Sequence, residues 1–333
     1  MKFSKYIPAL PLLAALLTAP MAAFWCHQAE AQTAQAYPSK TVRVVIAWPP
    51  SGANDMAGRV LAQKLSQSMG QAFYIDNRGG AAGTIGAEVV AKSPADGYTL
   101  LVHSTTHVGN PWIYKKLPYD TLKDFAPVGL IASQPGVLVV HPSLPVKTVK
   151  DLIALAKAKP KSINYGSTGN GGLPHLSMSL FEQMANVSLV HVPYKGGAPA
   201  ITALMSGETQ VMIATLASAI TQIQAGRLRA IAVSGDERLK SVPDLPTIAE
   251  SGLPGYDMNP WIGLFAPAGT PKAIIEKLNK ETARILKMPD VIQQLATQGA
   301  EPWVMTPEQF ARRLVEDYEK YGKLIKATGA EIN

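Results

Sequence analysis

Strand-like and helix-like segments alternate along most of this chain, and the alternation constrains its fold more than any other feature. Short runs of β-branched and apolar residues, such as 42–48 and 211–215, are each followed by a longer segment that reads as a helix. The predicted strands are 42–48, 72–77, 98–104, 124–131, 137–141, 163–167, 188–192, 211–215 and 229–233, and the predicted helices are 55–69, 84–92, 148–158, 174–185, 197–206 and 217–225, with a helical tail over 271–328. Repeated βα units build mostly parallel sheets covered by helices, so the sequence predicts an α/β fold.

The first 31 residues have the pattern of a secretory signal peptide. Two lysines precede an uncharged apolar run over residues 7–24, and the tripeptide A-E-A at 29–31 fits a small-x-small cleavage site. A retained membrane anchor is the alternative, but the small residues at the end of the run and the polar stretch that follows favour removal. We therefore expect a periplasmic chain that is cleaved after Ala31, begins at Gln32 and lacks the single cysteine, Cys26.

Size and charge narrow the class of protein. About 300 residues exceed what one hydrophobic core usually fills, so two domains are expected. The formal net charge is +7, but the lysines and arginines are scattered, without an arginine-rich run or an aromatic platform. This distribution argues against a nucleic-acid partner. It is compatible with a mild field that favours anionic solutes, and equally with a merely solvated basic surface.

Three of the predicted strand-to-helix loops are rich in glycine and small hydroxyl side chains. They span residues 48–55, 104–110 and 167–175. In parallel α/β sheets, ligands bind beyond the carboxyl ends of the strands, where such loops gather. Helix N-termini also present unpaired N–H groups to anions. The loops therefore predict an anion site, and Asn54 or Asp55 is expected to cap the helix that follows the first of them.

Nine motifs occur in order from Tyr37 to the C-terminal helices. They are WPPSGAND, NRGGAAGTIGAEVVAK, ADGYTLL, LPYD, DFAPV, YGSTGNGGLPHL, HVPYKGGAPA, AGRLRAIAV and LPTIAESGLPGY. Together they resemble the Bug-type periplasmic solute-binding receptors of tripartite tricarboxylate transporters. The resemblance implies a two-lobed, type II periplasmic-binding-protein fold of the Venus-flytrap kind. Lobe 1 would comprise residues 37–137 and 257–333, and lobe 2 residues 138–256.

The resemblance also implies a function. Receptors of this family hold a small organic carboxylate in the cleft between the lobes, mainly through backbone N–H groups, hydroxyls and ordered water. The ligand expected here is a di- or tricarboxylate or an aromatic acid, bound by a monomer without a cofactor and delivered to membrane permease subunits. A ligand-sensing receptor for a membrane signalling partner is the alternative, because such modules share the two-lobed fold.

The candidate ligand contacts are the residues that match the family's loops, with Trp48, His175 and Thr215 beside them. In lobe 1 they are Trp48, Pro50, Ser51, Gly52, Asn54, Asp55, Ser104, Thr105, Thr106 and His107, and in lobe 2 Ser167, Thr168, Gly169, Asn170, Gly172, His175, Tyr194, Lys195, Gly196 and Thr215. We expect the amides and hydroxyls of these loops, rather than the charge of Lys195, to carry the carboxylate.

Two positions depart from the family's pattern. The first loop usually resembles P-G-G-P-T-D, whereas this chain has Ser51 in place of the second residue and Ala53-Asn54 in place of P-T. The strand that ends near Thr215 often carries Asp or Asn beside the ligand, and here the sequence is A-T-L-A. The missing acidic group argues against an amino-acid ligand and favours a longer aliphatic or an aromatic acid.

Two other classes of protein fit the sequence less well. Histidines and serines such as His107, His175 and Ser167 could suggest hydrolase chemistry, but there is no G-x-S-x-G elbow and no obvious acidic partner. No pair of potential metal ligands has the spacing of a helical metal site. The glycines at 79–83 lack the G-x-G-x-x-G spacing of a dinucleotide site, and we expect them to form a loop with positive φ. The sequence thus predicts a binding protein and no enzyme.

Overall fold

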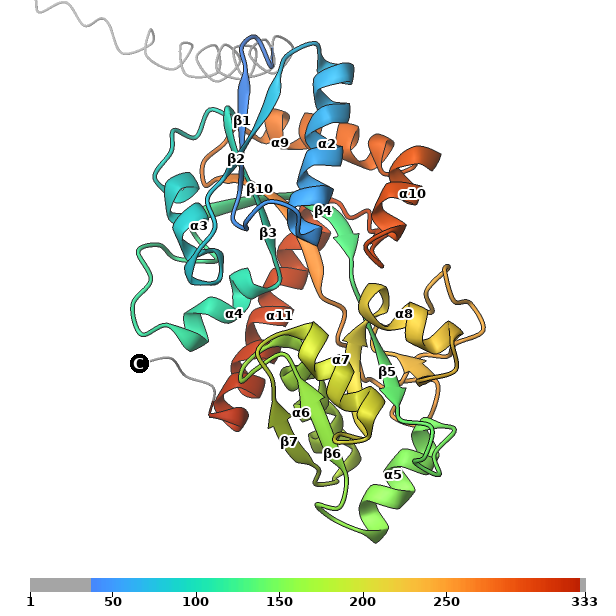
Figure 1. Cartoon of the computed structure of the whole chain (residues 1–333). Coiled ribbons are helices and arrows are strands. Elements are labelled where there is room, and N and C mark those ends of the chain that lie inside the picture. The colour runs from blue at the N-terminus through green and yellow to red at the C-terminus, as the bar shows by residue number, and fades with distance from the viewer. Residues whose placement is uncertain (1–36, 330–333) are drawn as a thin grey trace, which may run out of the picture.

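The structure, a computed structural model, describes residues 37–329, so the expected signal peptide lies outside the described residues. Two β-sheets lie one above the other along the length of the molecule, each flanked by helices (Figure 1). The upper, six-stranded sheet has the order β11-β4-β10-β3-β1-β2. Its strands are β1 (Val42–Ile46), β2 (Phe73–Asn77), β3 (Thr99–Ser104), β4 (Phe125–Ser133), β10 (Trp261–Pro267) and β11 (Glu301–Pro302).

The lower, five-stranded sheet has the order β7-β6-β8-β5-β9. Its strands are β5 (Gly136–Val140), β6 (Asn164–Ser167), β7 (Val190–Pro193), β8 (Val211–Thr215) and β9 (Arg229–Val233). We call the part around the upper sheet lobe 1 and the part around the lower sheet lobe 2. The exact lobe limits expected from the sequence stay a prediction.

The two sheets repeat one topology. In lobe 1, β1 lies between β2 and β3 and runs parallel to both, while β10 is antiparallel to its neighbours β3 and β4. In lobe 2, β6 lies between β7 and β8 in the same way, and β5 is the reversed strand. The reversed strands β10 and β5 are those that enter their sheets directly from the other lobe. Strands β1 and β6, with the loops that follow them, are therefore topological equivalents.

Helices cover both faces of each sheet. In lobe 1 they are α2 (Ala53–Met69), α3 (Thr84–Ala91), α4 (Thr106–Ile113), α9 (Lys272–Ile285), α10 (Pro289–Ala296) and α11 (Pro307–Thr328), with a short 3₁₀ turn η1 (Ala81–Gly83). In lobe 2 they are α5 (Val149–Ala158), α6 (Leu173–Ala185), α7 (Gly197–Ser206) and α8 (Leu216–Gln224). Among residues 37–329, no helix is both long enough and apolar enough to cross a bilayer.

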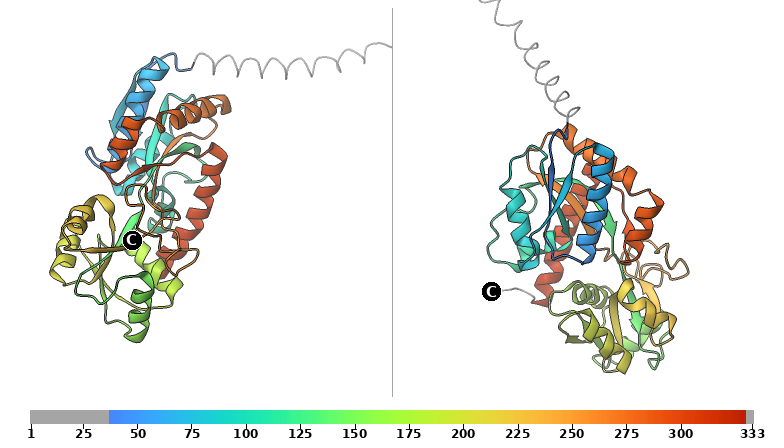
Figure 2. Two further views of the ribbon diagram at one scale, coloured as in Figure 1. Left: turned by 90° about the vertical axis from the view of Figure 1, so that its right-hand side faces the viewer. Right: turned by 45° about the horizontal axis from the view of Figure 1, so that its top comes forward.

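The hydrophobic core continues from one lobe into the other. Helices α2, α9 and α10 pack on one face of the upper sheet, and α7 and α8 pack on one face of the lower sheet. A third cluster joins the remaining faces, from Phe310 and Ile325 of α11 to Leu176 and Phe181 of α6. Figure 2 shows α11 running along one side of the molecule from lobe 1 down to lobe 2. The C-terminal helix therefore belongs to the connection between the lobes.

Three elements differ from the sequence-based expectation. The tail is not a single helical stretch but three helices, α9, α10 and α11, interrupted by β11. The strand β10 was not expected, although all seven of its residues are buried. Residues 104–110 were expected to form a polar loop, whereas residues 106–113 form helix α4 although it contains a glycine and Pro111. Its close packing against Gly322 of α11, where a side chain would collide with the ring of Trp112, explains the helix through tertiary contact.

The chain crosses between the lobes directly after β4 and again between β9 and β10. The two crossings are hydrogen-bonded to each other. Gln134 donates its N–H to the carbonyl of Pro260 at 2.7 Å, and Gly136 donates to the hydroxyl of Ser234 at 2.7 Å. Because they run side by side, the crossings form a hinge of two strands.

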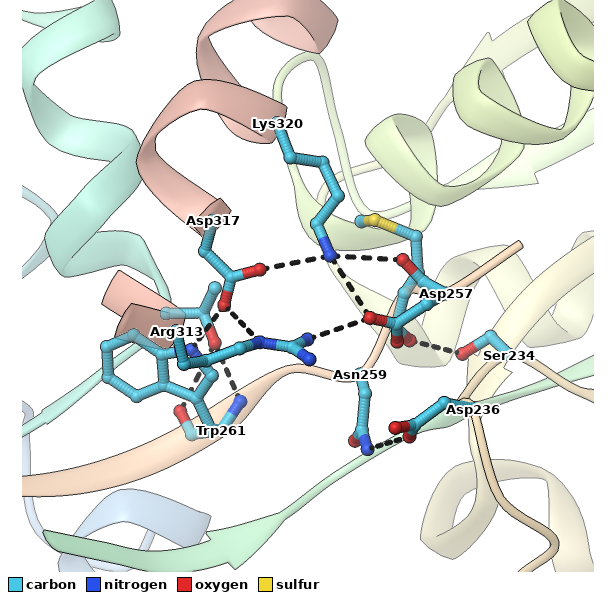
Figure 3. A network of polar contacts seen from close by, with 10 residues as sticks. Ser234, Asp236, Asp257, Asn259, Trp261, Arg313, Asp317 and Lys320 are labelled. Carbon is cyan, nitrogen blue, oxygen red and sulfur yellow. Dashed lines mark hydrogen bonds and ion pairs between the residues drawn. The ribbon is translucent and has the colours of Figure 1, made fainter. Parts of the chain in front are cut away.

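A buried ion network fastens α11 to the second crossing (Figure 3). Asp317 is 1% exposed and accepts hydrogen bonds from Trp261 Nε1 and Arg313 Nε, both at 2.8 Å. Arg313 and Lys320 also pair with Asp257, at 3.0 and 3.4 Å. Every charge in the cluster has an opposite partner, as burial requires. The hinge is thus held in place on the side of α11.

Candidate ligand-binding site between the lobes

A cavity of about 240 Å³ lies between the two lobes and α11. It is bordered by the loops that follow β3 and β6, which lie at the carboxyl ends of these strands as the sequence predicts. The lining residues are Ala82, Thr106, Gly109, Asn110, Ile113 and Tyr114 of lobe 1, Asn170, Gly171, Gly172, Leu173 and Leu176 of lobe 2, and Tyr321 and Ile325 of α11. None of these side chains is acidic or basic.

The β1–α2 loop is braced by Asp55, and here the structure corrects the expected helix cap. The N-cap residue is Gly52, in extended conformation, and no side chain caps the helix. Asp55 lies inside the first turn and is 3% exposed. Its carboxylate accepts the N–H of Ser51 at 2.9 Å, Arg59 Nε at 2.8 Å and Asn77 Nδ2 at 2.8 Å. Burial alone raises the pKa of Asp55, but these hydrogen bonds outweigh it and the net pKa is lowered, so the carboxylate is ionised.

The same loop contains a strained residue. Ser51 has a φ of +74°, in the left-handed region that favours glycine. Its replacement of a glycine in the family's pattern therefore costs conformational energy. Pro50, Ser51 and Gly52 are exposed and Asn54 is half-buried, whereas Trp48 packs edge-on against the ring of His103 at 6.2 Å.

The β3–α4 loop separates into residues that face the cavity and residues that face the core. Thr106 lines the cavity, and its hydroxyl lies 3.0 Å from that of Ser104. Thr105 is fully buried and accepts the N–H of Trp261 at 2.6 Å, so it ties the loop to β10. His107 is also fully buried, among His103, Tyr119, Phe125 and Phe265. Burial lowers the pKa of His107 well below its ordinary value, so the ring is neutral.

In lobe 2, the loop from Ser167 to Gly172 is held by its own hydrogen bonds. Ser167 is fully buried, its Oγ accepts the N–H of Gly169 at 3.1 Å, and it lies 2.6 Å from His191 Nε2. Gly171 donates its N–H to His175 Nδ1 at 3.0 Å. Gly169 and Gly171 have φ values of +123° and +71°, which a residue with a side chain rarely adopts. The loop owes its shape to these glycines.

Two amides of this loop remain for a ligand. Within residues 37–329, the N–H groups of Thr168 and Asn170 have no protein acceptor. Those of Gly169 and Gly172 donate inside the loop, and that of Gly171 donates to His175 of α6. Asn170 and Gly172 line the cavity directly. The free amide of Asn170 at the cavity wall suits an oxyanion, which can accept a hydrogen bond from it without a charged partner.

The other predicted residues of lobe 2 lie around the rim or behind it. His175 is buried behind the Ser167–Gly172 loop, while Lys195 and Thr215 are exposed. Gly196, with a φ of +110°, precedes α7. The hydroxyl of Tyr194 donates to Glu208 Oε1 at 2.9 Å, and Glu208 precedes β8, on the side opposite to its cavity-facing end. The structure therefore brings together Thr106, Asn170 and Gly172 at the cavity. Contact of the others with a ligand stays a prediction.

Sequence reasoning missed most of the cavity's walls. Asn110 and Ile113 belong to α4, where a loop was expected over 104–110, and Tyr114 is the C-cap residue of this helix. Tyr321 and Ile325 come from α11, more than 140 residues after the Ser167–Gly172 loop. In the sequence they read as ordinary apolar positions of an amphipathic helix. Only the packing of α11 across both lobes places them at the site.

The Ser167–His191 pair is not arranged for hydrolysis. The hydroxyl of Ser167 is fully buried and engaged with Gly169, so it has no route to a substrate. Burial lowers the pKa of His191 to about 4, which makes it a weak base at neutral pH. The pair contributes to structure rather than to chemistry.

Two lobes joined by a two-stranded hinge, with loops from both at a shared cavity, define a solute-binding receptor. The chain belongs to the tripartite tricarboxylate transporter family receptors, the TctC family, because the sequence model of that family matches residues 57–330. This result confirms the resemblance to Bug-type receptors, the two-lobed α/β fold and the prediction of a binding protein rather than an enzyme. Receptors of this family are periplasmic.

Known proteins similar to this chain support the assignment. Protein BugT of Bordetella pertussis is 34% identical over 303 residues, covering 90% of this chain and 93% of BugT. Rpa4515 of Rhodopseudomonas palustris, solved with adipate, is 38% identical with a TM-score of 0.70, covering 88% and 98% of the two chains. MatC of the same organism, with bound malate, is 32% identical with a TM-score of 0.66, covering 87% of this chain and 100% of MatC. A TctC protein from Polaromonas without ligand is 27% identical with a TM-score of 0.80 over 87% and 99%.

Proposed function

We propose that this receptor captures a small organic carboxylate between its lobes and delivers it to the membrane permease of a tripartite tricarboxylate transporter. The observation that carries the proposal is the cavity shared by both lobes, which is lined by Asn170, whose amide has no protein acceptor within residues 37–329, and by Thr106 with its hydroxyl. The free amide of Thr168 lies in the same loop, two residues before Asn170. Such neutral donors stabilise a carboxylate without the desolvation penalty of a buried cation. The adipate and malate complexes of the two Rhodopseudomonas relatives support the same ligand class.

The lining of the cavity contains both polar and apolar side chains, and this mixture bears on the ligand. Thr106, Asn110 and Asn170 supply polar groups, and Ile113, Leu173, Leu176 and Ile325 supply apolar ones. A carboxylate with a hydrocarbon body would place its charge at the polar groups and its methylene or ring carbons against the apolar side chains. Each buried methylene contributes about 0.8 kcal/mol, so the apolar side chains favour a longer aliphatic or an aromatic acid over a short, fully polar one.

Closure of the lobes around the ligand is part of the proposal. The arrangement described above is more similar to the ligand-free Polaromonas protein than to the adipate and malate complexes, although these are more identical in sequence. This order of similarity supports an open state. A ligand that contacts both lobes would then shift the population toward a closed state. We place the lobe limits at the two crossings, close to residues 137/138 and 256/257.

The site of action follows from the family and the N-terminal pattern. We propose export to the periplasm with cleavage after Ala31, as the small residues before Gln32 indicate. Intact mass of the secreted protein tests this step. A mass that includes residues 1–31, or a lipid attached at Cys26, would overturn it.

A calorimetric and thermal-shift screen of linear mono-, di- and tricarboxylates and of aromatic acids tests the ligand class. A ligand at 100 times its Kd should stabilise the folded protein by about 2.7 kcal/mol. Solution scattering with the ligand that binds best should show a smaller radius of gyration than the ligand-free protein. Binding of uncharged solutes in place of carboxylates, or no compaction at saturation, would contradict the proposal.

A further inference from the structure

Three aromatic rings stack beneath the Ser167–Gly172 loop, which borders the proposed ligand site. His175 of α6 and His191 of β7 lie nearly parallel, with ring centroids 3.9 Å apart and 7° between their planes. Tyr165 of β6 stacks on His191 at 4.9 Å and 18°. The rings therefore join the two strands and the helix that surround the loop.

Both histidines are hydrogen-bonded to the loop. His175 Nδ1 accepts the N–H of Gly171 at 3.0 Å. His191 Nε2 lies 2.6 Å from the hydroxyl of Ser167, which accepts the N–H of Gly169 and lies 3.2 Å from the carbonyl of Gly169. His175 thus binds the amide of Gly171 directly, and His191 contacts the amide of Gly169 through the hydroxyl of Ser167. These two amides alternate along the loop with the free amides of Thr168 and Asn170.

The hydrogen bonds of the loop indicate which ring nitrogens carry protons. Because Nδ1 of His175 accepts, its proton must reside on Nε2. Ser167 Oγ has one proton, and if that proton goes to the carbonyl of Gly169, His191 must donate from Nε2 to Oγ. All contacts of the loop are satisfied when both rings are neutral with the proton on Nε2.

We propose that His175 and His191 are positioning residues that hold the Ser167–Gly172 loop in its anion-accepting shape, and that the loop keeps this shape only while His175 is neutral. The proposal rests on the function proposed above for this cavity, because the loop matters for binding only if the ligand lies there. Neither ring touches the ligand. They act through the glycine amides that they orient.

Protonation would undo the arrangement. A cationic His175 would present an N–H to the N–H of Gly171, and two cations would face each other at 3.9 Å. The other titratable groups around the rings are Tyr165 and Glu182, and Glu182 is engaged with the N–H of Leu189. Burial lowers the pKa of His175, and burial together with His175 lowers that of His191 to about 4, so the neutral forms prevail at neutral pH.

Matched substitutions test the positioning role. His175→Leu removes the acceptor for Gly171, whereas His175→Asn keeps an acceptor oxygen near the position of Nδ1. We expect His175→Leu to weaken adipate binding about tenfold and to speed hydrogen exchange of the Gly171 amide at least tenfold, and His175→Asn to restore both to within about threefold of the wild type. His141→Leu removes a lobe 2 imidazole that bonds Ser143 away from the loop, and should change neither quantity.

The two measurements separate this proposal from the function on which it rests. If adipate does not bind the wild type, the choice of adipate as ligand fails, and exchange of the Gly171 amide alone decides the proposal. Equal exchange in the Leu and Asn variants of His175 would overturn it, since the ring would then act only by its volume. A long-range ¹H–¹⁵N spectrum that places the His175 proton on Nδ1 would overturn it as well.

The pH profile provides an independent readout. The folded-state pKa of His175 is lowered, so its contribution to the loop is complete above the ordinary value near 6.5 and is lost as the pH falls through the lowered value. Affinity for adipate should therefore fall more steeply with acid in the wild type than in His175→Asn, whose amide does not titrate. Protonation of adipate is common to both proteins and cancels in the ratio. Parallel profiles would overturn the proposal.

Discussion

The loops after β1 and β6 occupy equivalent places in the two lobes, yet they are braced by opposite kinds of group. In lobe 1 the brace is Asp55, an ionised and buried carboxylate that accepts the N–H of Ser51. In lobe 2 it is the neutral pair His175 and His191. The carboxylate of Asp55 already occupies the amide of Ser51, whereas the neutral rings of lobe 2 leave the adjacent amides attractive to an anion. We therefore predict that lobe 2 binds the anion and that lobe 1 closes over it.

The largest effect expected from this comparison is on the stability of lobe 1. Asp55→Ala leaves the N–H of Ser51 and the side chains of Asn77 and Arg59 without their acceptor, and should lower the free energy of unfolding by about 3 kcal/mol. Urea denaturation measures the change. Asp290→Ala, which removes an exposed partner of Lys64, should cost less than about 1 kcal/mol. Equal effects of the two substitutions would refute the brace in lobe 1.

The two braces should fail at different pH values when the protein is acidified. The pKa of Asp55 is lowered below its ordinary value of 3.8, so its contribution is complete above that value and is lost as the pH falls through the lowered one. The pKa of His175 is lowered from its ordinary value of 6.5 and that of His191 is lowered to about 4, so the histidine brace is lost as the pH falls through these lowered values. The wild type should therefore lose ligand affinity at a higher pH than the one at which Asp55 stops supporting the fold.

A smaller effect, on binding, is expected at the loop of lobe 2. A Cβ at residue 172 would lie 2.7 Å from Thr168 Oγ1 and 3.3 Å from the carbonyl of Gly169, so Gly172→Val should displace the free amide of Thr168. We expect at least a tenfold weaker Kd for adipate, about 1.4 kcal/mol, by calorimetry. Gly197→Ala is the control, because a Cβ there meets no atom within 4 Å. Unchanged binding by Gly172→Val would shift the anion site away from this loop.

Relief of strain in the loop of lobe 1 should have a modest effect of opposite sign. Ser51→Gly keeps the left-handed conformation but removes its cost of about 1–2 kcal/mol. The substitution also makes the unfolded chain more flexible, which offsets part of the gain. We expect a net gain of about 0.5–1 kcal/mol in thermal unfolding. Ser51→Ala keeps the strain and loses only the hydroxyl, so a gain in that variant would point to a cause other than backbone conformation.

The smallest effect is expected at Lys195, the charged side chain predicted to lie at the rim. It is exposed, so Lys195→Ala should cost less than about 1 kcal/mol of binding free energy and should become neutral in high salt. Loss of binding in this variant would mean that a cation clamps the carboxylate, against the amide capture proposed for lobe 2.

The sequence predicted the parts of this molecule that depend on local pattern. The strands β8 and β9 and the helix α7 have the expected bounds, and the glycines at 80 and 83 have the expected positive φ. The loops around Ser167 and Thr106 were identified because glycines and small hydroxyl residues directly after a strand are typical of anion sites. Their side chains were less predictable: Thr105 and His107 share a loop with Thr106 but face the core.

What the sequence could not predict depends on contacts between distant segments. Strand β10 is a short apolar run with a central glycine, and only its place between β3 and β4 makes it a strand. Helix α4 exists because it packs on α11, despite Pro111. The N-cap prediction was wrong by two residues for Asn54 and three for Asp55, because the backbone of Gly52 already adopts the capping conformation. The side chain of Asp55 instead accepts the N–H of Ser51, which precedes the helix.

The place of β10 in the sheet has a consequence for the order in which the molecule can be assembled. All strands of the lower sheet lie within residues 136–233, so this lobe can form as soon as that continuous segment is available. The upper sheet starts earlier in the chain, but β3 and β4 have no common neighbour until residue 267 has been synthesised. Synthesis proceeds from the N-terminus. The lobe that begins the chain is thus the last to be completed, and the receptor acquires its cleft only when the final hundred residues arrive.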